Sequence, residues 1–171
     1  MASINRLSPI LAIAVGVLHA GLAPVLGVAD VSPNLVLVAV VLVACSAGLL
    51  PGAVWAFSAG LTANVLSGEP MGSIPLTLLA AAALAAALAP AATRLGMVHP
   101  VLATFAGSIV ADLGMLGIHR LLDGGQGWAG VPIGIILVAA ALNAALAALV
   151  LGVVWLQRRR TRTPVMSRWP T

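Results

Sequence analysis

The stretch "GLTANVLSGEPMGSIPL", residues 60–76, decides how this chain is divided, because it interrupts a sequence that is otherwise almost entirely apolar. A polar Asn64 stands in its apolar first half, and a short polar break rich in Gly and Pro follows. Clusters of these residues are typical of turns. The break therefore predicts a tight turn between two helices, in which Gly68 and Gly72 take positive φ and Pro70 fixes the corner.

The composition indicates that the helices on both sides of this turn lie in a membrane. Hydrophobic residues make up 61% of the chain and charged residues 7%, and the mean hydropathy is +1.15. Soluble domains carry about 25% charged residues, so this chain has too few to cover a surface in water. Its long Ala-rich runs lack the alternation of barrel strands. We expect an all-α, polytopic integral membrane protein.

The apolar runs predict six spans, since a helix needs about 20 apolar residues to cross a bilayer. The longest run, residues 33–66, exceeds one span, and Pro51–Gly52 is a strong turn signal that divides it. We therefore expect one compact six-helix bundle over residues 1–157 and a basic cytoplasmic tail over residues 158–171. The expected spans are residues 9–28, 33–50, 52–67, 74–93, 98–120 and 131–157.

The positive charge is concentrated at one end of the chain. All eight basic residues are arginines, and five of them are C-terminal: Arg158, Arg159, Arg160, Arg162 and Arg168. Six spans place both termini on one side, and with that side cytoplasmic only Arg120 lies outside. We expect the cluster at Arg158, Arg159 and Arg160 to set the topology and to contact anionic lipid of the bilayer, not nucleic acid.

Small residues recur every fourth position on one face of the third predicted span: Gly52, Ala56, Gly60, Asn64 and Gly68. Helices in lipid associate through such faces, where backbones approach closely. Shorter stripes follow the same spacing: Ala12, Gly16 and Ala20; Ala103, Gly107 and Ala111; Ala139, Asn143 and Ala147. The stripes predict helix-packing faces, and they would also suit lateral docking of partner proteins.

Asp112 is the one carboxylate inside a predicted span. An ionised Asp at the bilayer centre costs about 2.5–3.5 kcal/mol, so we expect it to face the bundle interior or a polar cavity. One interpretation is proton or cation coupling, or a ligand contact, with His119 on the same helical face. The other, which we favour, is a structural Asp satisfied by neighbouring helices. Asn64 and Asn143 are expected to form interhelical hydrogen bonds.

The sequence offers little for catalysis or metal binding. His19 and His99 have no metal-ligand spacing to another His or Cys. An intramembrane aspartyl protease needs two facing carboxylates, and Ser58 in "AFSAG" lacks the nucleophile-elbow pattern. We expect no catalytic residue, no metal and no cofactor.

The chain from Pro33 onward resembles the rod shape-determining protein MreD family. The second predicted span begins "PNLVLVAVVL", similar to the Pro, acidic or Asn, Leu start typical of that family's second helix. The family then shows G-h-x-x-D-h-h-x-x-x-P-h-G-h-x-x-h, where h is apolar. This chain matches at Gly60, Val65, Leu66, Pro70, Met71, Gly72 and Leu76. Asn64 stands where the family usually has Asp, which favours a hydrogen-bonding, structural role. The resemblance covers residues 33–88, and beyond them only size and topology are similar.

The resemblance implies a non-catalytic scaffold subunit of the bacterial cell-elongation complex, which synthesises peptidoglycan and maintains rod shape. It implies a multi-pass protein of the inner membrane with both termini cytoplasmic. The implied partners are MreC-like, RodA-like and class B penicillin-binding proteins and, indirectly, the MreB filament.

The MreD family is also similar to the substrate-binding S components of energy-coupling-factor vitamin transporters, which gives the alternative function. In those proteins a docking helix has small residues four apart, which Ala12, Gly16 and Ala20 imitate. With two Phe, no Tyr and few polar residues in its spans, this chain would offer a polar vitamin few partners. That composition favours the scaffold.

Overall fold

The computed structural model of the chain describes residues 2–22, 25, 31–123 and 132–160, with side chains from Ser8 onward. None of these described residues belongs to a strand, so the expected all-α class is confirmed. The helices are α1 (Ala2–Leu22), α2 (Leu35–Ala47), α3 (Leu49–Ser67), α4 (Ser73–Ala87), the 3-10 helix η1 (Ala89–Ala91), α5 (Ala92–Leu95), α6 (Val98–Leu122) and α7 (Ile133–Arg160).

Three of the described helices, α3, α6 and α7, are long and apolar enough to cross a membrane. A fourth candidate is α4 taken together with Ala89–Leu95, which is bent by 41° at the break between them. The apolar part of α1, Ser8–Leu22, and α2 are shorter than a full span. By length and composition, three of the described helices could therefore cross a membrane, or four if the bent pair is one span.

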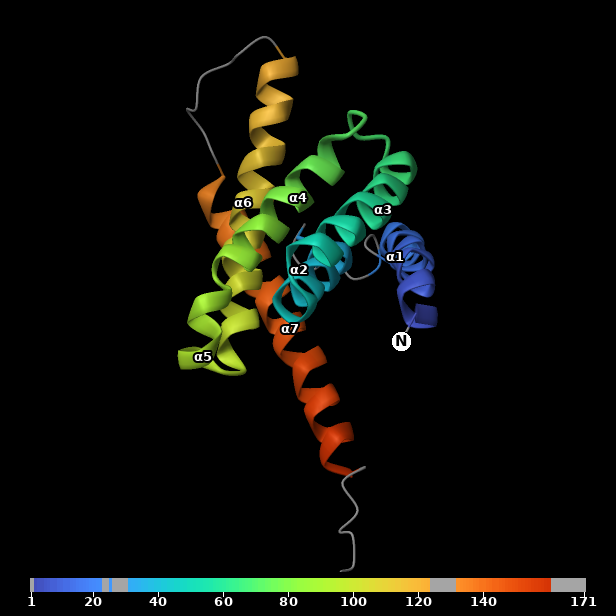
Figure 1. Ribbon diagram of the computed structural model, residues 1–171. Coiled ribbons are helices and arrows are strands. Elements are labelled where there is room, and N and C mark those ends of the chain that lie inside the picture. Colours follow the sequence, from blue (N-terminus) through green and yellow to red (C-terminus); the bar gives the residue numbers. More distant parts are fainter. Residues whose placement is uncertain (1, 23–24, 26–30, 124–131, 161–171) are drawn as a thin grey trace, which may run out of the picture.

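Helix α2, which is shorter than α1, α3, α4, α6 and α7, lies at the centre of the bundle (Figure 1) and contacts all five of them. Its 13 residues reach only about 20 Å. Val40 and Val41 in its middle are fully buried. Because α2 is enclosed by other helices, it can be apolar on every side and still shorter than the bilayer is thick.

The break between α2 and α3 is not at Pro51–Gly52, as expected, but three residues earlier at Gly48. Gly48 has φ 94°, a backbone conformation that favours glycine. Pro51 lies in the first turn of α3, where its missing N–H costs no hydrogen bond. The third helix is consequently longer than the predicted span over residues 52–67, and the second is the short one.

The predicted fourth span, residues 74–93, is also divided. Helix α4 ends at Ala87, and η1 and α5 continue the chain at an angle before α6 begins at Val98. His99 lies in the first turn of α6 and is buried. Its Nε2 is 2.9 Å from the carbonyl oxygen of Leu88, which joins the start of α6 to the end of α4.

The small-residue stripes pack helices against one another inside the chain. A Cβ at Gly16 would come within 2.8 Å of the Ala59 carbonyl oxygen on α3, and one at Gly52 within 2.7 Å of the Ala44 Cβ on α2. A Cβ at Gly60 would lie 3.0 Å from the Pro75 Cα on α4. Hence these glycines contact other helices of the same chain, which leaves their faces little room for the docking of partner proteins.

The other stripes are also largely internal, because Ala12, Ala103, Gly107, Ala111, Asn143 and Ala147 are buried. In the main stripe Ala56 and Asn64 are buried as well. Gly68, its fifth member, differs, because it is exposed and ends α3 with φ 71°.

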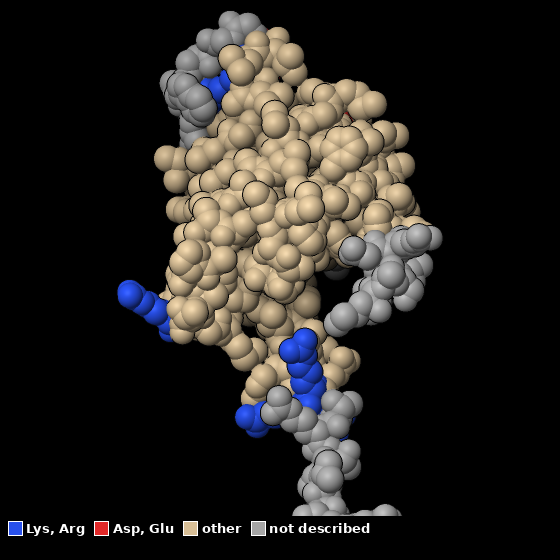
Figure 2. All heavy atoms as spheres, in the orientation of Figure 1, with Lys and Arg blue, Asp and Glu red and all other residues tan. Residues whose placement is uncertain are grey.

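The charged side chains lie at the two ends of the bundle, and the visible face between them is almost free of charge (Figure 2). The α3–α4 turn and the end of α6 share one end, while α5 and the end of α7 lie toward the other (Figure 1). Helix α7 continues through Arg158, Arg159 and Arg160, so the basic cluster is helical and does not begin a tail. The Arg159 guanidinium stacks over the Trp155 ring at 3.8 Å. The rest of the expected basic tail, residues 161–171, lies outside the described residues.

Candidate functional site

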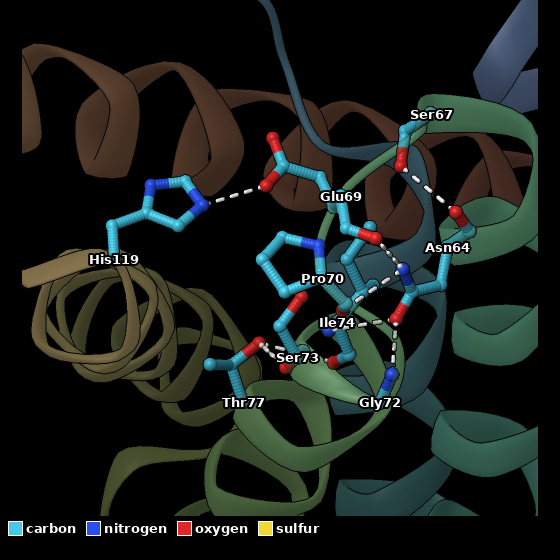
Figure 3. A network of polar contacts seen from close by, with 9 residues as sticks. All are labelled: Asn64, Ser67, Glu69, Pro70, Gly72, Ser73, Ile74, Thr77 and His119. Atoms are coloured by element: carbon cyan, nitrogen blue, oxygen red, sulfur yellow. Dashed lines mark hydrogen bonds and ion pairs between the residues drawn. The ribbon is translucent and has the colours of Figure 1, made fainter. Parts of the chain in front are cut away.

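The side chain of Asn64 holds the corner between α3 and α4 together (Figure 3). Its Oδ1 accepts hydrogen bonds from the backbone N–H of Gly72 (2.9 Å) and Ile74 (3.4 Å). Its Nδ2 donates to the carbonyl oxygens of Glu69 (2.9 Å) and Pro70 (3.2 Å). With Asn64 only 1% exposed, one amide thus replaces water for two donors and two acceptors of the turn.

This arrangement explains the glycines of the corner. Gly68 ends α3 with φ 71° and Gly72 precedes α4 with φ 87°, both in the left-handed region. Gly72 has no side chain to cap α4, and Asn64 supplies the cap from the preceding helix. An Asp at position 64 could accept the two N–H groups but, when ionised, could not donate to the two carbonyls. All four hydrogen bonds of the corner therefore require an amide side chain at position 64.

The corner is joined to α6 by an ion pair at its outer edge. Nε2 of His119 lies 2.7 Å from Oε2 of Glu69 (Figure 3), and both side chains are partly exposed. His119 shares a helix with Asp112, as expected, but its partner is Glu69. Sequence reasoning missed this contact, since the two residues are 50 positions apart.

A chain of polar contacts connects α2, α7 and α6. Oδ1 of Asn143 accepts from the backbone N–H of Asn34 at 2.7 Å, and its Nδ2 donates to Ser108 Oγ at 2.8 Å. Ser108 Oγ in turn donates to Asp112 Oδ2 at 3.3 Å. Asn143 therefore links three helices, whereas Asn64 pairs only with the adjoining turn. Asp112 is bonded by a hydroxyl of its own helix and not, as we favoured, by a neighbouring one.

Asp112 lies on the wall of a pocket of about 230 Å³. Six polar residues from α1, α6, the start of α2 and the α3–α4 region line this pocket: His19, Asn34, Ser67, Glu69, Thr77 and Asp112. Apolar side chains, among them Leu78 and Met115, form the rest of the wall. The composition predicted few partners for a polar vitamin, whereas six polar side chains line this one pocket.

The polar groups of the pocket are mostly hydrogen-bond acceptors. The hydroxyls of Ser67 and Thr77 donate their protons to backbone carbonyls of Asn64 and of Ser73 or Ile74. Nδ1 of His19 is buried, with no hydrogen-bond partner among the described residues. The pocket thus presents carboxylate and hydroxyl lone pairs, the Asn34 amide, and an imidazole nitrogen without a partner among the described residues.

The structure brings some predicted residues together and separates others. Asn64, Gly68, Pro70 and Gly72 share the corner, while Asp112 lies in the pocket beside it. Arg158, Arg159 and Arg160 are at the far end of α7. Among the described residues, no three His, Cys, Asp or Glu side chains are grouped so that they could hold a metal ion.

Two residues of the pocket, His19 and Asn34, were not predicted from the sequence to belong to a binding site. For His19 only metal-ligand spacing was considered. Asn34 had a recognisable signal, because an Asn before an apolar helix is a preferred N-cap, and its Oδ1 does accept from the N–H of Leu37 at 2.9 Å.

Comparison with known proteins found no matching family model, no similar curated protein and no similar solved structure.

Proposed function

We propose that the chain crosses the bacterial inner membrane six times, with both termini in the cytoplasm. Counting α4 with α5 as one bent span, the described apolar helices number six. Arg94 belongs to α5 and the C-terminal arginines to the end of α7, which lie toward one end of the bundle (Figure 1). Glu69 belongs to the α3–α4 turn, and Arg120 and Asp123 to the end of α6, which lie toward the other end. The arginine-rich end is the cytoplasmic one by the positive-inside rule.

The function that we assign is that of a non-catalytic scaffold subunit of the bacterial cell-elongation complex, as in the MreD family that the sequence resembles. The observation behind this assignment is the Asn64 corner. The residues of the resemblance, Gly60, Pro70 and Gly72 among them, form one locally bonded unit around Asn64. A rigid corner of this kind suits a protein whose role is to present fixed surfaces to other membrane proteins.

The partner-binding surface is assigned to the outside of α7, because the small-residue stripes are buried within the chain. Leu149, Val153 and Leu156 are each about half exposed and follow a helical spacing along the second half of α7. This half extends past the other helices of the bundle (Figure 1). The partners are MreC-like, RodA-like and class B penicillin-binding proteins.

Site-directed photo-crosslinking in living cells tests the scaffold. A photoreactive amino acid at Val153 is expected to crosslink to an MreC-like or RodA-like protein. The matched control is the same amino acid at Ala140, which is fully buried in α7 and should give no crosslink. Crosslinking at Val153 to an ATPase-bearing transport module, with no elongation protein recovered, would overturn the scaffold.

The second candidate is the substrate-binding component of a vitamin transporter, and the polar pocket is the observation that favours it. Its docking stripe is less favourable, because Ala12 is fully buried and Gly16 packs tightly on α3. Native mass spectrometry separates the candidates: a stoichiometric small molecule together with a transport module supports this one.

A further inference from the structure

We propose that the pocket around Asp112 binds a small organic cation with a primary ammonium group. This inference concerns the pocket alone, and it holds whether the chain is a scaffold or a transport component. Three properties of the pocket lead to it: its charge, the excess of hydrogen-bond acceptors over donors in its lining, and its size.

The charge of the pocket is negative. Asp112 and Glu69 both line it, and no Arg is among the lining residues. Glu69 is paired with His119, whereas no ion pair to Asp112 is present in the part of the chain that the structure describes. A carboxylate in an apolar bundle is costly unless a positive group or hydrogen-bond donors compensate it. Ser108 supplies one long hydrogen bond of 3.3 Å, so a bound cation would complete the compensation.

The hydrogen-bonding pattern favours an ammonium group, which has three donors and no acceptor. The Thr77 and Ser67 hydroxyl protons already point to backbone carbonyls, so these oxygens can only accept from a ligand. His19 Nδ1 has no partner among the described residues and can accept when the neutral imidazole carries its proton on Nε2. The Nδ2 amide of Asn34 is a donor in the lining, but an anionic ligand would meet two carboxylates of like charge there.

The size and the ligand set exclude two other occupants. The pocket, about 230 Å³, is smaller than the roughly 300–1,000 Å³ of typical ligand sites, so the ligand is small. A bound divalent metal would need several carboxylate or imidazole ligands close together, and the described residues include no such group. A small amine fits both the volume and the spacing.

Calorimetric titration of the full-length protein in lipid nanodiscs tests the site, with n-propylammonium as the probe and propionate as a probe of equal size and opposite charge. The expected result is saturable binding of propylammonium and none of propionate. Asp112→Asn keeps the shape of the side chain and removes the charge, and it should weaken binding by about tenfold or more. Asp123→Asn is the matched control, since Asp123 is an exposed carboxylate at the end of α6, outside the pocket, and binding should not change.

A second variant guards against loss of folding. His19→Phe keeps a ring of similar size and removes the unpartnered nitrogen, so binding should weaken while helicity by circular dichroism is retained. Equal binding by the wild type and both pocket variants, stronger binding of propionate, or equal displacement by potassium ions would each overturn the proposal. Its failure leaves the crosslinking result at Val153 unaffected, so the two proposals fail separately.

Discussion

The Asn64 corner and the Asp112 pocket lie side by side, yet they treat their polar groups in opposite ways. In the corner, both polar atoms of the buried Asn64 amide are paired with the backbone. In the pocket, His19 Nδ1 has no partner among the described residues and Asp112 accepts one long hydrogen bond. Glu69 belongs to both, through its backbone carbonyl and its carboxylate respectively. The difference indicates that the corner is structural and that the pocket is open to a ligand.

The two regions also differ in how they are encoded. All partners of Asn64 lie within ten residues of it, so a short sequence motif suffices to build the corner. The pocket is assembled from α1, α6, the start of α2 and the α3–α4 region. Its formation therefore depends on the packing of the whole bundle, and in particular on the close approach of helices at their glycines.

The largest effect is expected when the corner is broken by Asn64→Leu. The Leu side chain has the same branching at Cγ but leaves two N–H groups and two carbonyls of the turn without their partner. Each buried group left unpaired costs about 1–3 kcal/mol, so the free energy of unfolding should fall by about 3 kcal/mol or more. Unfolding of the purified protein in mixed SDS micelles measures it.

Asn64→Asp sharpens the same test, because it keeps the acceptor and removes the donor. We expect it to lose less stability than Asn64→Leu, since the N–H groups of Gly72 and Ile74 stay bonded. If the Asp variant were as stable as the wild type, the bonds to the Glu69 and Pro70 carbonyls would contribute nothing, and the corner would not require an amide.

A smaller loss is expected from Gly60→Ala, which forces apart the two helices that the corner joins. The added Cβ would lie 3.0 Å from Cδ1 of Leu78 and 3.0 Å from Cα of Pro75, and the backbone atom cannot move aside freely. Overpacking of this kind costs about 1–3 kcal/mol. Thermal unfolding in detergent should therefore show a lower midpoint.

Gly134→Ala is the control for this substitution. Gly134 also lies in a helix, but a Cβ there meets nothing within 4 Å. Alanine is a better helix former than glycine by up to about 1 kcal/mol, so this variant should be as stable as the wild type or more stable. Equal destabilisation by both variants would show that the close α3–α4 contact is not what Gly60 provides.

Sequence reasoning predicted the all-α class and the Asn64 corner between α3 and α4 well, because both depend on local patterns. The start of α6 coincides with the predicted span, and Gly68 and Gly72 have the positive φ expected of them. The α2–α3 break was misplaced because Pro51 suits the first turn of a helix as well as a turn between helices. The bend after Ala87 was missed although Pro90, at the start of η1, is a break signal, because the apolar run continues on both sides of it.

The pocket could not be predicted, since no periodicity in the sequence indicates which polar residues of different helices will face one another. His19 and Asp112 are more than 90 positions apart and share the pocket only because α1, α3, α4 and α6 pack as they do. Likewise the stripes correctly indicate close packing, but not whether the neighbour is a helix of the same chain or of a partner.

The ion pair that links the corner to α6 should matter less than either corner residue. Glu69→Gln removes the charge from the contact with His119 and leaves the Glu69 backbone carbonyl bonded to Asn64. The pair is partly exposed, and such pairs contribute about 0–1 kcal/mol. The loss in unfolding free energy should stay within that range and shrink further at high salt. A loss comparable to that of Asn64→Leu would mean that the carboxylate, not the backbone, holds the corner.

The smallest effect on stability is expected for Asp112→Asn, although this variant should abolish most cation binding. The Asn Oδ1 can still accept from Ser108, and the neutral side chain avoids the cost of about 2.5–3.5 kcal/mol that an ionised Asp has at a helix centre in a bilayer. The unfolding free energy without ligand should therefore equal or exceed that of the wild type, measured in the same SDS titration as Asn64→Leu. The two variants therefore test opposite situations. Asn64→Leu places an apolar group where all hydrogen bonds of the amide are made, whereas Asp112→Asn places a neutral amide where a carboxylate lacks a counter-charge. If Asp112→Asn instead destabilised the protein by several kcal/mol, Asp112 would be as structural as Asn64, and the contrast between a closed corner and an open pocket would be wrong.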